Sequence, residues 1–301
     1  MKIRILGVPL DLGQERRGVD MGPSAIRAAG LNSALKGLNH HVEDSGNVPV
    51  KLAEEQHFGD RRAKYLNEIA ETCQDVAQRI HQTLEDGLFP LSLGGDHSVA
   101  VGTISGISRF YREREQTIGL LWIDAHGDMN TPESSPSGNV HGMPFASLLG
   151  IGPEPLTHMF KFAPKVLAKD CVLIGARDLD SRERRQIHAS GVNVFTMRDI
   201  DELGMRLVVQ RALDLATRDT AGFAVSFDMD VVDPDEAPGV GTAVPGGITF
   251  REAHLAMEII ADSKKMLSLE IVEVNPILDT LNRTAALAVG LASSALGKKI
   301  L

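Results

Sequence analysis

IGLLWIDAHGDMN, residues 118–130, joins an apolar run to a segment rich in acidic and imidazole side chains. Residues 118–123 are almost entirely apolar, as expected for a strand covered on both faces of a sheet. Asp124, His126 and Asp128 follow at every second position. In an extended chain such residues share one face, so we expect their side chains to point to one place. The stretch predicts a buried parallel strand whose carboxyl end carries a functional site.

Six further apolar runs predict the rest of the sheet. They are mostly continuous and rich in β-branched residues, and they span residues 3–8, 88–93, 172–174, 192–195, 223–227 and 266–272. Helical patterns separate them, most clearly over 61–85, where apolar residues recur at three- and four-residue spacing before Gly87. Further helices are expected to begin near Ser24, Glu202, Arg251 and Leu281, and Thr249 with Glu252 has the form of a capping box.

This alternation of strands and helices predicts an α/β fold. We expect a three-layer αβα sandwich with a mostly parallel central sheet of about eight strands, in a single domain over residues 1–301. The irregular stretches are 7–23, 127–144 and 231–248. In open parallel sheets ligands bind at the carboxyl ends of the strands, so these loops are the places to look for function.

Composition excludes several classes of partner. The net charge of −9 would repel nucleic acid and an anionic membrane surface. Pro9 and Asp11 interrupt the first apolar run before a signal-peptide core could form, and no later run is long enough to span a bilayer. Cys73 and Cys171 lie in apolar segments and are expected to be buried thiols. We therefore expect a cytoplasmic enzyme or binding protein.

Three strand ends carry the same kinds of polar residue. They are GGDHS (94–98), DAHGDMN (124–130) and DMDVVDP (228–234). A single Asp after a strand is usually a turn former or helix cap, and a single His is usually just hydrogen-bonded. Four buried carboxylates at one sheet edge, however, would repel one another and cost several kcal/mol to desolvate unless cations neutralised them.

The tally of ligands indicates how many cations to expect. Four carboxylates and the imidazoles of His97 and His126 exceed the needs of one tetrahedral zinc. They suit two ions that share bridging carboxylates, and oxygen-rich sites without thiolate favour Mn²⁺, with Fe²⁺ or Co²⁺ as substitutes. Such a pair would lower the pKa of a bridging water to about 7, which predicts hydrolysis.

The motifs resemble the signatures of the ureohydrolases, the superfamily of arginase, agmatinase, guanidinobutyrase and formiminoglutamase. The similar segments are GGDHS, DAHGDMN, SGNVHGMP (137–144) and SFDMDVVDPDEAPGVGT (226–242). The resemblance runs in order from LDLGQERRGVDMGPSAIR (10–27) to EVNPILD (273–279), so it covers nearly the whole chain.

This resemblance implies two Mn²⁺ per subunit and assigns the ligands: Asp124 and Asp228 bridge, His97 and Asp128 complete one ion, and His126 and Asp230 complete the other. Asp96 is outside this pattern and is expected to support the site from behind. Asp233, which precedes Pro234, is expected to form a turn.

The resemblance also implies a mechanism. A hydroxide bridging the ions would attack the guanidinium carbon, and Asp128 would hold its proton. The leaving amine needs a proton donor, and His141 resembles the family's proton shuttle, although a His in such a loop can also be purely structural. Glu273 resembles the carboxylate that pairs with the guanidinium through a two-point fork, whereas Glu270 is expected to form a buried salt bridge or to lie on the surface.

Substrate choice within the superfamily depends on what binds the other end of the molecule. Asn130, Thr131, Ser137 and Asn139 match an arginase-like pattern for an α-carboxylate, and Asp180 and Glu183 match positions that face an α-ammonium. Agmatine lacks the α-carboxylate, so these polar side chains would have no anion to bind. We therefore expect hydrolysis of L-arginine to L-ornithine and urea; agmatinase, guanidinobutyrase or a non-catalytic metal-stabilised protein is the alternative.

Ala243 follows Thr242 where a proline is usual, so we expect that loop to be less rigid, although the Thr242 hydroxyl remains available to the guanidinium. The metal loops contain no cluster of Arg or Lys, which disfavours a two-metal phosphoesterase. The resemblance implies a homo-oligomer, either a trimer or a hexamer.

Overall fold

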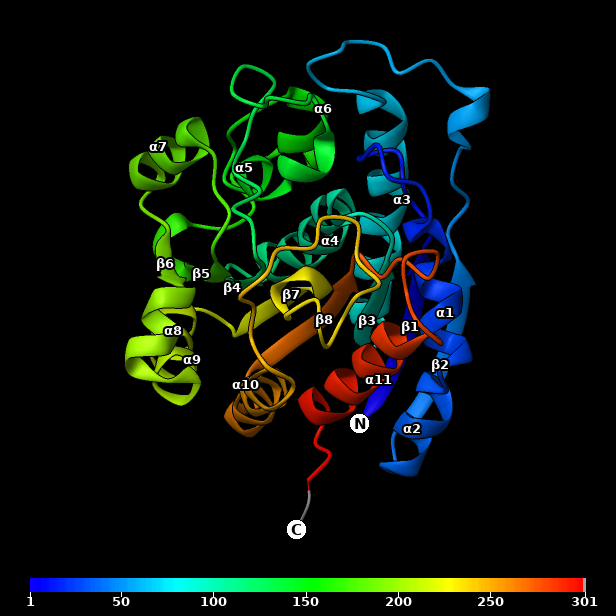
Figure 1. Cartoon of the computed structure of the whole chain (residues 1–301), viewed down its shortest axis with the longest axis vertical. Coiled ribbons are helices and arrows are strands. Elements are labelled where there is room, and N and C mark those ends of the chain that lie inside the picture. The colour runs from blue at the N-terminus through cyan, green and yellow to red at the C-terminus, as the bar shows by residue number, and fades with distance from the viewer. Residues whose placement is uncertain (300–301) are drawn as a thin grey trace.

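The computed structural model describes residues 1–299, and its centre is one sheet of eight strands (Figure 1). Across the sheet the strands are β2 (His41–Asn47), β1 (Lys2–Val8), β3 (Phe89–Gly94), β8 (Met266–Val272), β7 (Phe223–Asp228), β4 (Gly119–Ile123), β5 (Cys171–Ala176) and β6 (Asn193–Thr196). Every neighbouring pair is parallel. The predicted α/β fold is therefore confirmed, and the sheet is wholly rather than mostly parallel.

The seven strands predicted from apolar runs are all present, and the eighth, β2, was missed. Its sequence, HVEDSGN, has no apolar pattern, and its side chains are exposed or half-buried. An edge strand needs only backbone pairing with one neighbour and a few apolar contacts, so its residues can stay polar. Arg27 and Asn47, joined by a 2.6 Å hydrogen bond, help to hold this edge.

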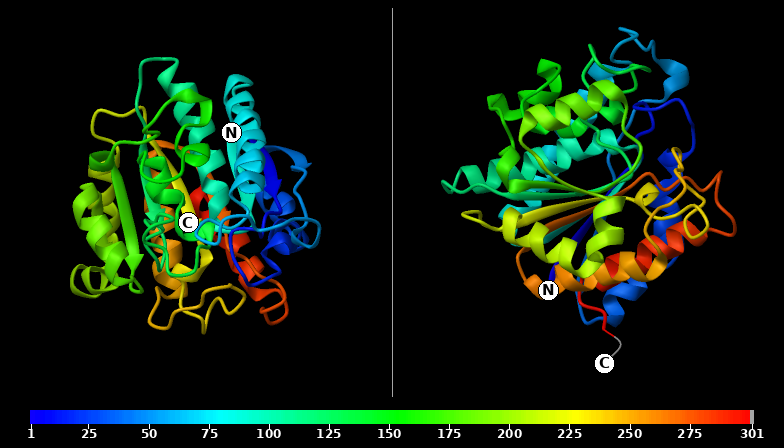
Figure 2. Two further views of the ribbon diagram at one scale, coloured as in Figure 1. Left: turned by 90° about the horizontal axis from the view of Figure 1, so that it is seen from above. Right: turned by 60° about the vertical axis from the view of Figure 1, so that its left-hand side comes forward.

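Helices cover both faces of the sheet, as Figure 2 shows when the sheet is viewed nearly edge-on. One layer contains α1 (Gly22–Ala28), α2 (Leu31–Gly37), α8 (Met197–Leu203), α9 (Met205–Ala216), α10 (Phe250–Ser263) and α11 (Arg283–Ala295). The other contains α3 (Leu66–Glu85), α4 (Ala100–Arg112), α5 (Pro144–Leu148), α6 (Glu154–Thr157) and α7 (Ser181–Ser190). No helix within residues 1–299 is long and apolar enough to cross a membrane.

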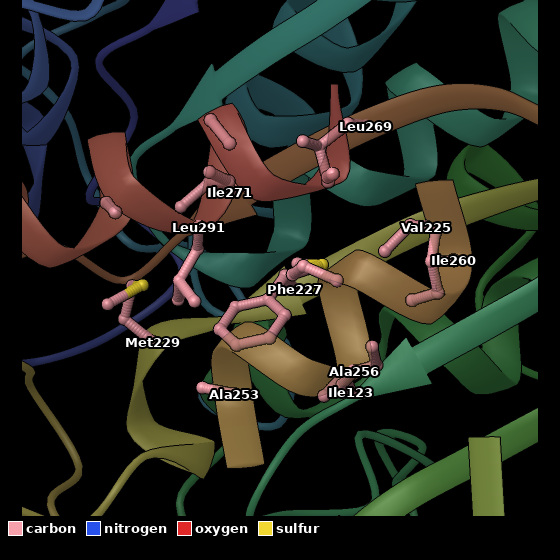
Figure 3. Packing of buried hydrophobic residues seen from close by; sticks show 14 of the residues in the cluster. Ile123, Val225, Phe227, Met229, Ala253, Ala256, Ile260, Leu269, Ile271 and Leu291 are labelled. Carbon is pink, nitrogen blue, oxygen red and sulfur yellow. The ribbon is translucent and has the colours of Figure 1, made fainter. Parts of the chain in front are cut away.

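Each interior strand contributes alternate side chains to the two layers. In β4, Ile123 belongs to the core beneath α9 and α10, whereas Trp122 belongs to the core beneath α4 and α5. Figure 3 shows the first of these cores, where the Phe227 ring lies among small side chains of α10 and Leu291 of α11. Burial on both faces explains why these strands read as continuous apolar runs.

Several helices differ from their predicted bounds for local reasons. The pattern over 61–85 becomes helical only at Leu66, after Tyr65 adopts a left-handed φ of 54°. The helix expected near Glu202 is two helices, α8 and α9, separated by Gly204. The predicted capping box of Thr249 and Glu252 is present at the start of α10.

Helix α4 was not predicted, because its sequence contains two glycines and several β-branched residues. Both glycines are needed for its packing on α3. A Cβ at Gly102 would lie 2.7 Å from the Cys73 carbonyl oxygen, and one at Gly106 would lie 2.5 Å from that of Ala77. The glycines that weaken the helical signal thus allow the two helices to approach closely.

Strand order determines where a ligand can bind. Strands β3, β8, β7 and β4 are neighbours, although the chain visits them in the order β3, β4, β7, β8. Their carboxyl ends therefore form one continuous edge, and all the predicted metal ligands, together with His141 and Glu273, lie at this edge or in the loops that follow it. Such a change of direction in strand order is the usual location of a ligand site in α/β sheets.

Candidate metal centre

The loop after β3 places His97 at the sheet edge. His97 begins a short 3₁₀ turn, His97–Val99, which Asp96 caps by accepting the Ser98 N–H. Asp96 also accepts the N–H of Gly13 at 2.8 Å. Its carboxylate is therefore occupied with backbone donors, in agreement with the supporting role predicted for it.

The segment after β4 brings Asp124, His126 and Asp128 together, but not by the extended alternation that we expected. The strand ends at Ile123, the Asp124 carboxylate accepts the His126 N–H at 2.7 Å, and Asp128 has a left-handed φ of 50°. The same correction applies after β7, where Asp228 accepts the Asp230 N–H at 2.8 Å within a 3₁₀ turn. Aspartates readily make such turns with their own backbone.

Six side chains converge in the resulting centre. His97 Nδ1 lies 3.0 Å from oxygens of Asp124 and Asp128 and 3.2 Å from one of Asp228. His126 Nδ1 lies 2.9 Å from Asp230 and 3.5 Å from Asp124. The carboxylates are buried, and Asp124 belongs to both groups of possible metal ligands at this sheet edge, one with His97 and Asp228 and the other with His126 and Asp230. We call these six side chains the floor: His97, Asp124, His126, Asp128, Asp228 and Asp230.

A row of side chains beneath the floor fixes the tautomer of His97. Strand register aligns Ser226 with Glu270 of β8 and with Trp122 of β4. The Ser226 hydroxyl lies 2.8 Å from His97 Nε2 and donates to Glu270 Oε1 at 2.8 Å. Because a hydroxyl has one hydrogen, Ser226 accepts from His97 Nε2, which leaves Nδ1 facing the carboxylates. Glu270 is thus fully buried in a hydrogen-bonded chain, not in the salt bridge or on the surface as predicted.

The floor strongly attracts positive charge. Burial opposes protonation of both imidazoles, but the neighbouring carboxylates raise the pKa of His97 and of His126 well above the ordinary value. Burial and the nearby Asp124 also raise the pKa of Asp128, to about 6. Carboxylates so close together can remain ionised only beside compensating cations.

The donor set fits metal ions. His97 Nδ1 is buried and has no hydrogen-bond partner among residues 1–299, although three carboxylates surround it. Metal–ligand bonds of about 2.0 to 2.2 Å place neighbouring ligands about 3 Å apart, which is the spacing found here. Four carboxylates, two imidazoles and no thiolate suit Mn²⁺ or a similar divalent ion.

Trp122 supports the floor from the side of α4. Its Nε1 donates to Asp124 at 2.9 Å, and its ring stacks on His97 with centroids 4.1 Å apart. This role could not be predicted from sequence, since a tryptophan in an apolar strand is ordinarily a core residue.

Glu273 and His141 lie together beside the floor. The buried Glu273 carboxylate accepts from Gln14 Nε2 at 2.9 Å, from the His97 N–H at 3.0 Å and from His141 Nδ1 at 3.2 Å. Although burial opposes protonation of His141, its hydrogen bond with Glu273 raises its pKa to about 9. Glu273 has a left-handed φ of 65°, a costly conformation for a non-glycine residue that is typical of functional sites.

The floor opens into a cleft of about 210 Å³. Among the predicted substrate contacts, Asn130, Ser137, Asn139, Asp180, Glu183 and Thr242 line this cleft, and we call them the rim. Thr131 does not belong to it, because it lines a separate cleft with Phe58 and Pro132. Asp178 lines the metal cleft and was missed, although its position in the loop after β5 could have suggested it.

Most rim side chains hydrogen-bond to one another or to nearby backbone. Asn130 donates to Asp180 at 3.0 Å and accepts from Ser134 at 2.8 Å. Asp180 also caps α7, and Glu183 accepts the Met129 N–H at 3.0 Å. Burial raises the pKa of Glu183 to about 8. The rim is therefore held in place before any ligand arrives.

The loop over 231–248 is held against the floor. Thr242 donates its hydroxyl hydrogen to Asp230 at 2.8 Å, so only its oxygen lone pairs remain for a guanidinium. Arg177 donates to carbonyl oxygens of Asp230, Val231 and Val244. Asp233 accepts N–H groups of Asp235, Gly246 and Gly247, the turn-forming role predicted for it.

Comparison with known proteins agrees with this geometry. The chain matches the model of the Arginase family over residues 1–297. It is 49% identical over 299 residues to the arginase of Bacillus subtilis (strain 168), with 99% of each chain covered. It is 47% identical over 300 residues to the arginase of Bacillus caldovelox, again with 99% of each covered. The native crystal structure of the Bacillus caldovelox enzyme superposes with a TM-score of 0.95 over 99% of each chain. The chain therefore belongs to the arginase family.

Proposed function

We propose that this chain is an arginase that hydrolyses L-arginine to L-ornithine and urea. The observation that carries the proposal is the floor: six metal-ligand side chains converge at the bottom of a cleft whose walls present amides, hydroxyls and carboxylates. The full-length relatives at 47% and 49% identity are themselves named arginases.

We propose that the floor would hold two Mn²⁺: His97, Asp124, Asp128 and Asp228 would hold one, and Asp124, His126, Asp228 and Asp230 the other. Asp124 is the residue best placed to contact both, because it belongs to both buried groups of converging ligand atoms. Bound divalent cations would supply water activation, by lowering the pKa of water so that hydroxide is available near neutrality. Asp128 would accept a hydrogen bond from that nucleophile.

Glu273 would bind the substrate guanidinium. A carboxylate has about four lone-pair positions, and three are already used by Gln14, His97 and His141. On Glu273 Oε1 both lone-pair positions are occupied, one by the His97 N–H and one by His141 Nδ1. A guanidinium that binds both carboxylate oxygens therefore requires the His141 ring to move away. The Thr242 oxygen, which can still accept, would take a further guanidinium N–H.

His141 would then supply the proton that the leaving group needs. Water adds its oxygen to the guanidinium carbon, the bond from that carbon to the side-chain nitrogen breaks, and the nitrogen leaves protonated as the ornithine amine. The high pKa of His141, about 9, keeps it charged near neutrality and so able to donate. Release from Glu273 would couple substrate binding to proton delivery.

The rim would select the amino-acid end of the substrate. Ser137 and Asn139 offer neutral donors for an α-carboxylate, and Asn130 retains one N–H after its bond to Asp180. Asp180 would attract the α-ammonium, and Glu183 would accept a hydrogen bond from it, either directly or through water. Thr131 would have at most an indirect role, because it lies in the neighbouring cleft.

We further propose that residues 1–301 form one domain, that the protein is a homo-oligomer, either a trimer or a hexamer, and that it acts in arginine catabolism in the cytoplasm. Both cysteines are buried and free within the described chain, which is in keeping with a reducing compartment.

A substrate panel tests the proposed function. The Mn²⁺-loaded protein is assayed for urea or amine release with L-arginine, agmatine, 4-guanidinobutyrate and formiminoglutamate. We expect kcat/KM for L-arginine to exceed that of every other substrate by at least about a hundredfold, since binding sites that lose a required anion discriminate strongly. Faster turnover of agmatine or guanidinobutyrate would overturn the substrate assignment, and no turnover of any substrate would favour a non-catalytic protein.

A further inference from the structure

We infer that Lys64 is a specificity-determining residue: it positions the Asn139 amide and adds positive charge where the α-carboxylate of the substrate binds. The inference rests on the proposed function and extends it to a residue outside the cleft lining. Lys64 Nζ donates to Asn139 Oδ1 at 3.2 Å, and the Lys64 side chain is 21% exposed.

The contact fixes which end of the Asn139 amide faces the cleft. An ammonium only donates hydrogen bonds, so the amide oxygen must point towards Lys64 and the NH₂ group must point away from it. The NH₂ group has no hydrogen-bond partner elsewhere in residues 1–299, and Asn139 lines the cleft. The amide is thus held with a donor available to an anion.

Backbone contacts keep Lys64 and the recognition loop in register. The Lys64 N–H donates to the Gly138 carbonyl oxygen at 3.0 Å. Gly138 approaches the opposing chain so closely that a Cβ there would lie 1.9 Å from the Arg61 carbonyl oxygen. The segment that carries Lys64 is therefore packed directly against the loop that carries Ser137 and Asn139.

The charge of Lys64 is only partly offset. Its partner Glu15 lies 2.6 Å away but is 70% exposed, so solvent screens the carboxylate more than the lysine. A cation just behind an amide donor strengthens that donor and attracts an anion on its far side. L-Arginine carries such an anion, whereas agmatine does not.

Lys64→Met tests the inference, because it keeps the length of the side chain and removes its charge and donors. We expect KM for L-arginine to rise roughly three- to tenfold with kcat nearly unchanged, and the difference to shrink at high salt. Lys51→Met is the matched control, since Lys51 also pairs with an exposed glutamate at 2.6 Å but neither lines the cleft nor bonds to a lining residue within residues 1–299. It should leave KM unchanged.

L-Argininamide separates recognition from general damage. Its carboxylate is replaced by a neutral amide, so Lys64→Met should change its KM by less than about twofold. Lys64→Arg, which retains a charged donor, should restore KM for L-arginine most of the way. Thermal unfolding of each variant reports whether the fold is intact.

The outcomes distinguish the two proposals. Wild-type protein that does not hydrolyse L-arginine refutes the proposed function itself. Hydrolysis with the same KM in Lys64→Met as in Lys51→Met overturns the inference and leaves the function standing. An equal rise in KM for L-arginine and L-argininamide also overturns it, because the lost contact would then not concern the carboxylate.

Discussion

The floor and the rim of the cleft are both polar, but they satisfy their polar atoms in opposite ways. In the floor, carboxylate oxygens face one another and His97 Nδ1, which has no hydrogen-bond partner in the described part of the chain, and every floor residue except His126 is buried. In the rim, Asn130 donates to Asp180 at 3.0 Å and accepts from the neighbouring Ser134 at 2.8 Å. The floor needs bound cations to offset the repulsion between its carboxylates. The rim needs none, because its side chains already hydrogen-bond within the protein, and only their remaining donors and acceptors face the cleft.

This difference predicts how each region responds to change. A substitution in the floor removes part of a cation's coordination shell, and the remaining buried carboxylates then repel one another. Substitution of a neutral rim side chain, such as Ser137 or Asn139, would remove one neutral hydrogen bond from a site open to water. Effects should therefore fall steeply from the floor to the rim.

The largest effect is expected for Asp124→Asn, because Asp124 contributes to both groups of ligand atoms. We expect loss of both ions and turnover at background, measured as metal content and urea release. Asp233→Asn, in the turn that follows β7, is the control and should retain its metal, since within residues 1–299 Asp233 accepts hydrogen bonds from backbone N–H groups only. Full metal content in Asp124→Asn would contradict the claim that floor residues bind the cations and rim residues do not.

His141→Ala should have the next largest effect while leaving the ions in place. Loss of a general acid typically costs about 10²- to 10⁴-fold in rate. We expect a fall in kcat of that size with metal content unchanged, since His141 bonds to Glu273 and not to the floor. A loss of metal that parallels the loss of rate would mean that His141 belongs to the floor.

Ser226→Ala tests whether the buried chain from His97 to Glu270 supports metal binding. Removing a hydrogen bond that orients a ligand typically weakens metal affinity about 10- to 100-fold. The matched control is Ser268→Ala, on the neighbouring strand β8, whose buried hydroxyl has no hydrogen-bond partner within the described residues. Equal Mn²⁺ affinities for the two variants, by calorimetric titration, would show that the chain does not orient His97.

Ser137→Ala should have the smallest effect, because Ser137 is exposed and its hydroxyl oxygen accepts only the Asn139 N–H, at 3.2 Å. Loss of one neutral hydrogen bond predicts a rise in KM for L-arginine of about tenfold or less, with kcat and metal content unchanged. A fall in kcat that exceeds the rise in KM would place Ser137 in the chemical step instead.

The same difference explains what could be predicted from sequence. Floor residues follow three strand ends. Residue type alone shows that burying these carboxylates together without cations would cost free energy. How they converge was not evident, because it depends on turns at Asp124 and Asp228 and on the left-handed Asp128. Hydrogen bonds from backbone N–H groups to side chains stabilise those turns, and the periodicity of apolar residues does not predict such bonds.

Tertiary contacts account for the remaining misses. Thr131 has the composition of a rim residue, but the chain turns at Ser134 and directs it into another cleft. Glu270 looked like surface or salt-bridge material until strand register placed it opposite Ser226. Lys64 lies 75 positions before Asn139 in sequence, so only the folded chain brings them together.

Titration of the metal-free chain with Mn²⁺ tests the central claim most directly, since it counts the cations that the floor requires. We predict saturation at two equivalents per chain, a rise in the temperature of unfolding as the ions bind, and arginine hydrolysis that appears with them. Saturation at one equivalent or none, with the unfolding temperature unchanged, would contradict the claim that repulsion within the floor is offset by two bound cations.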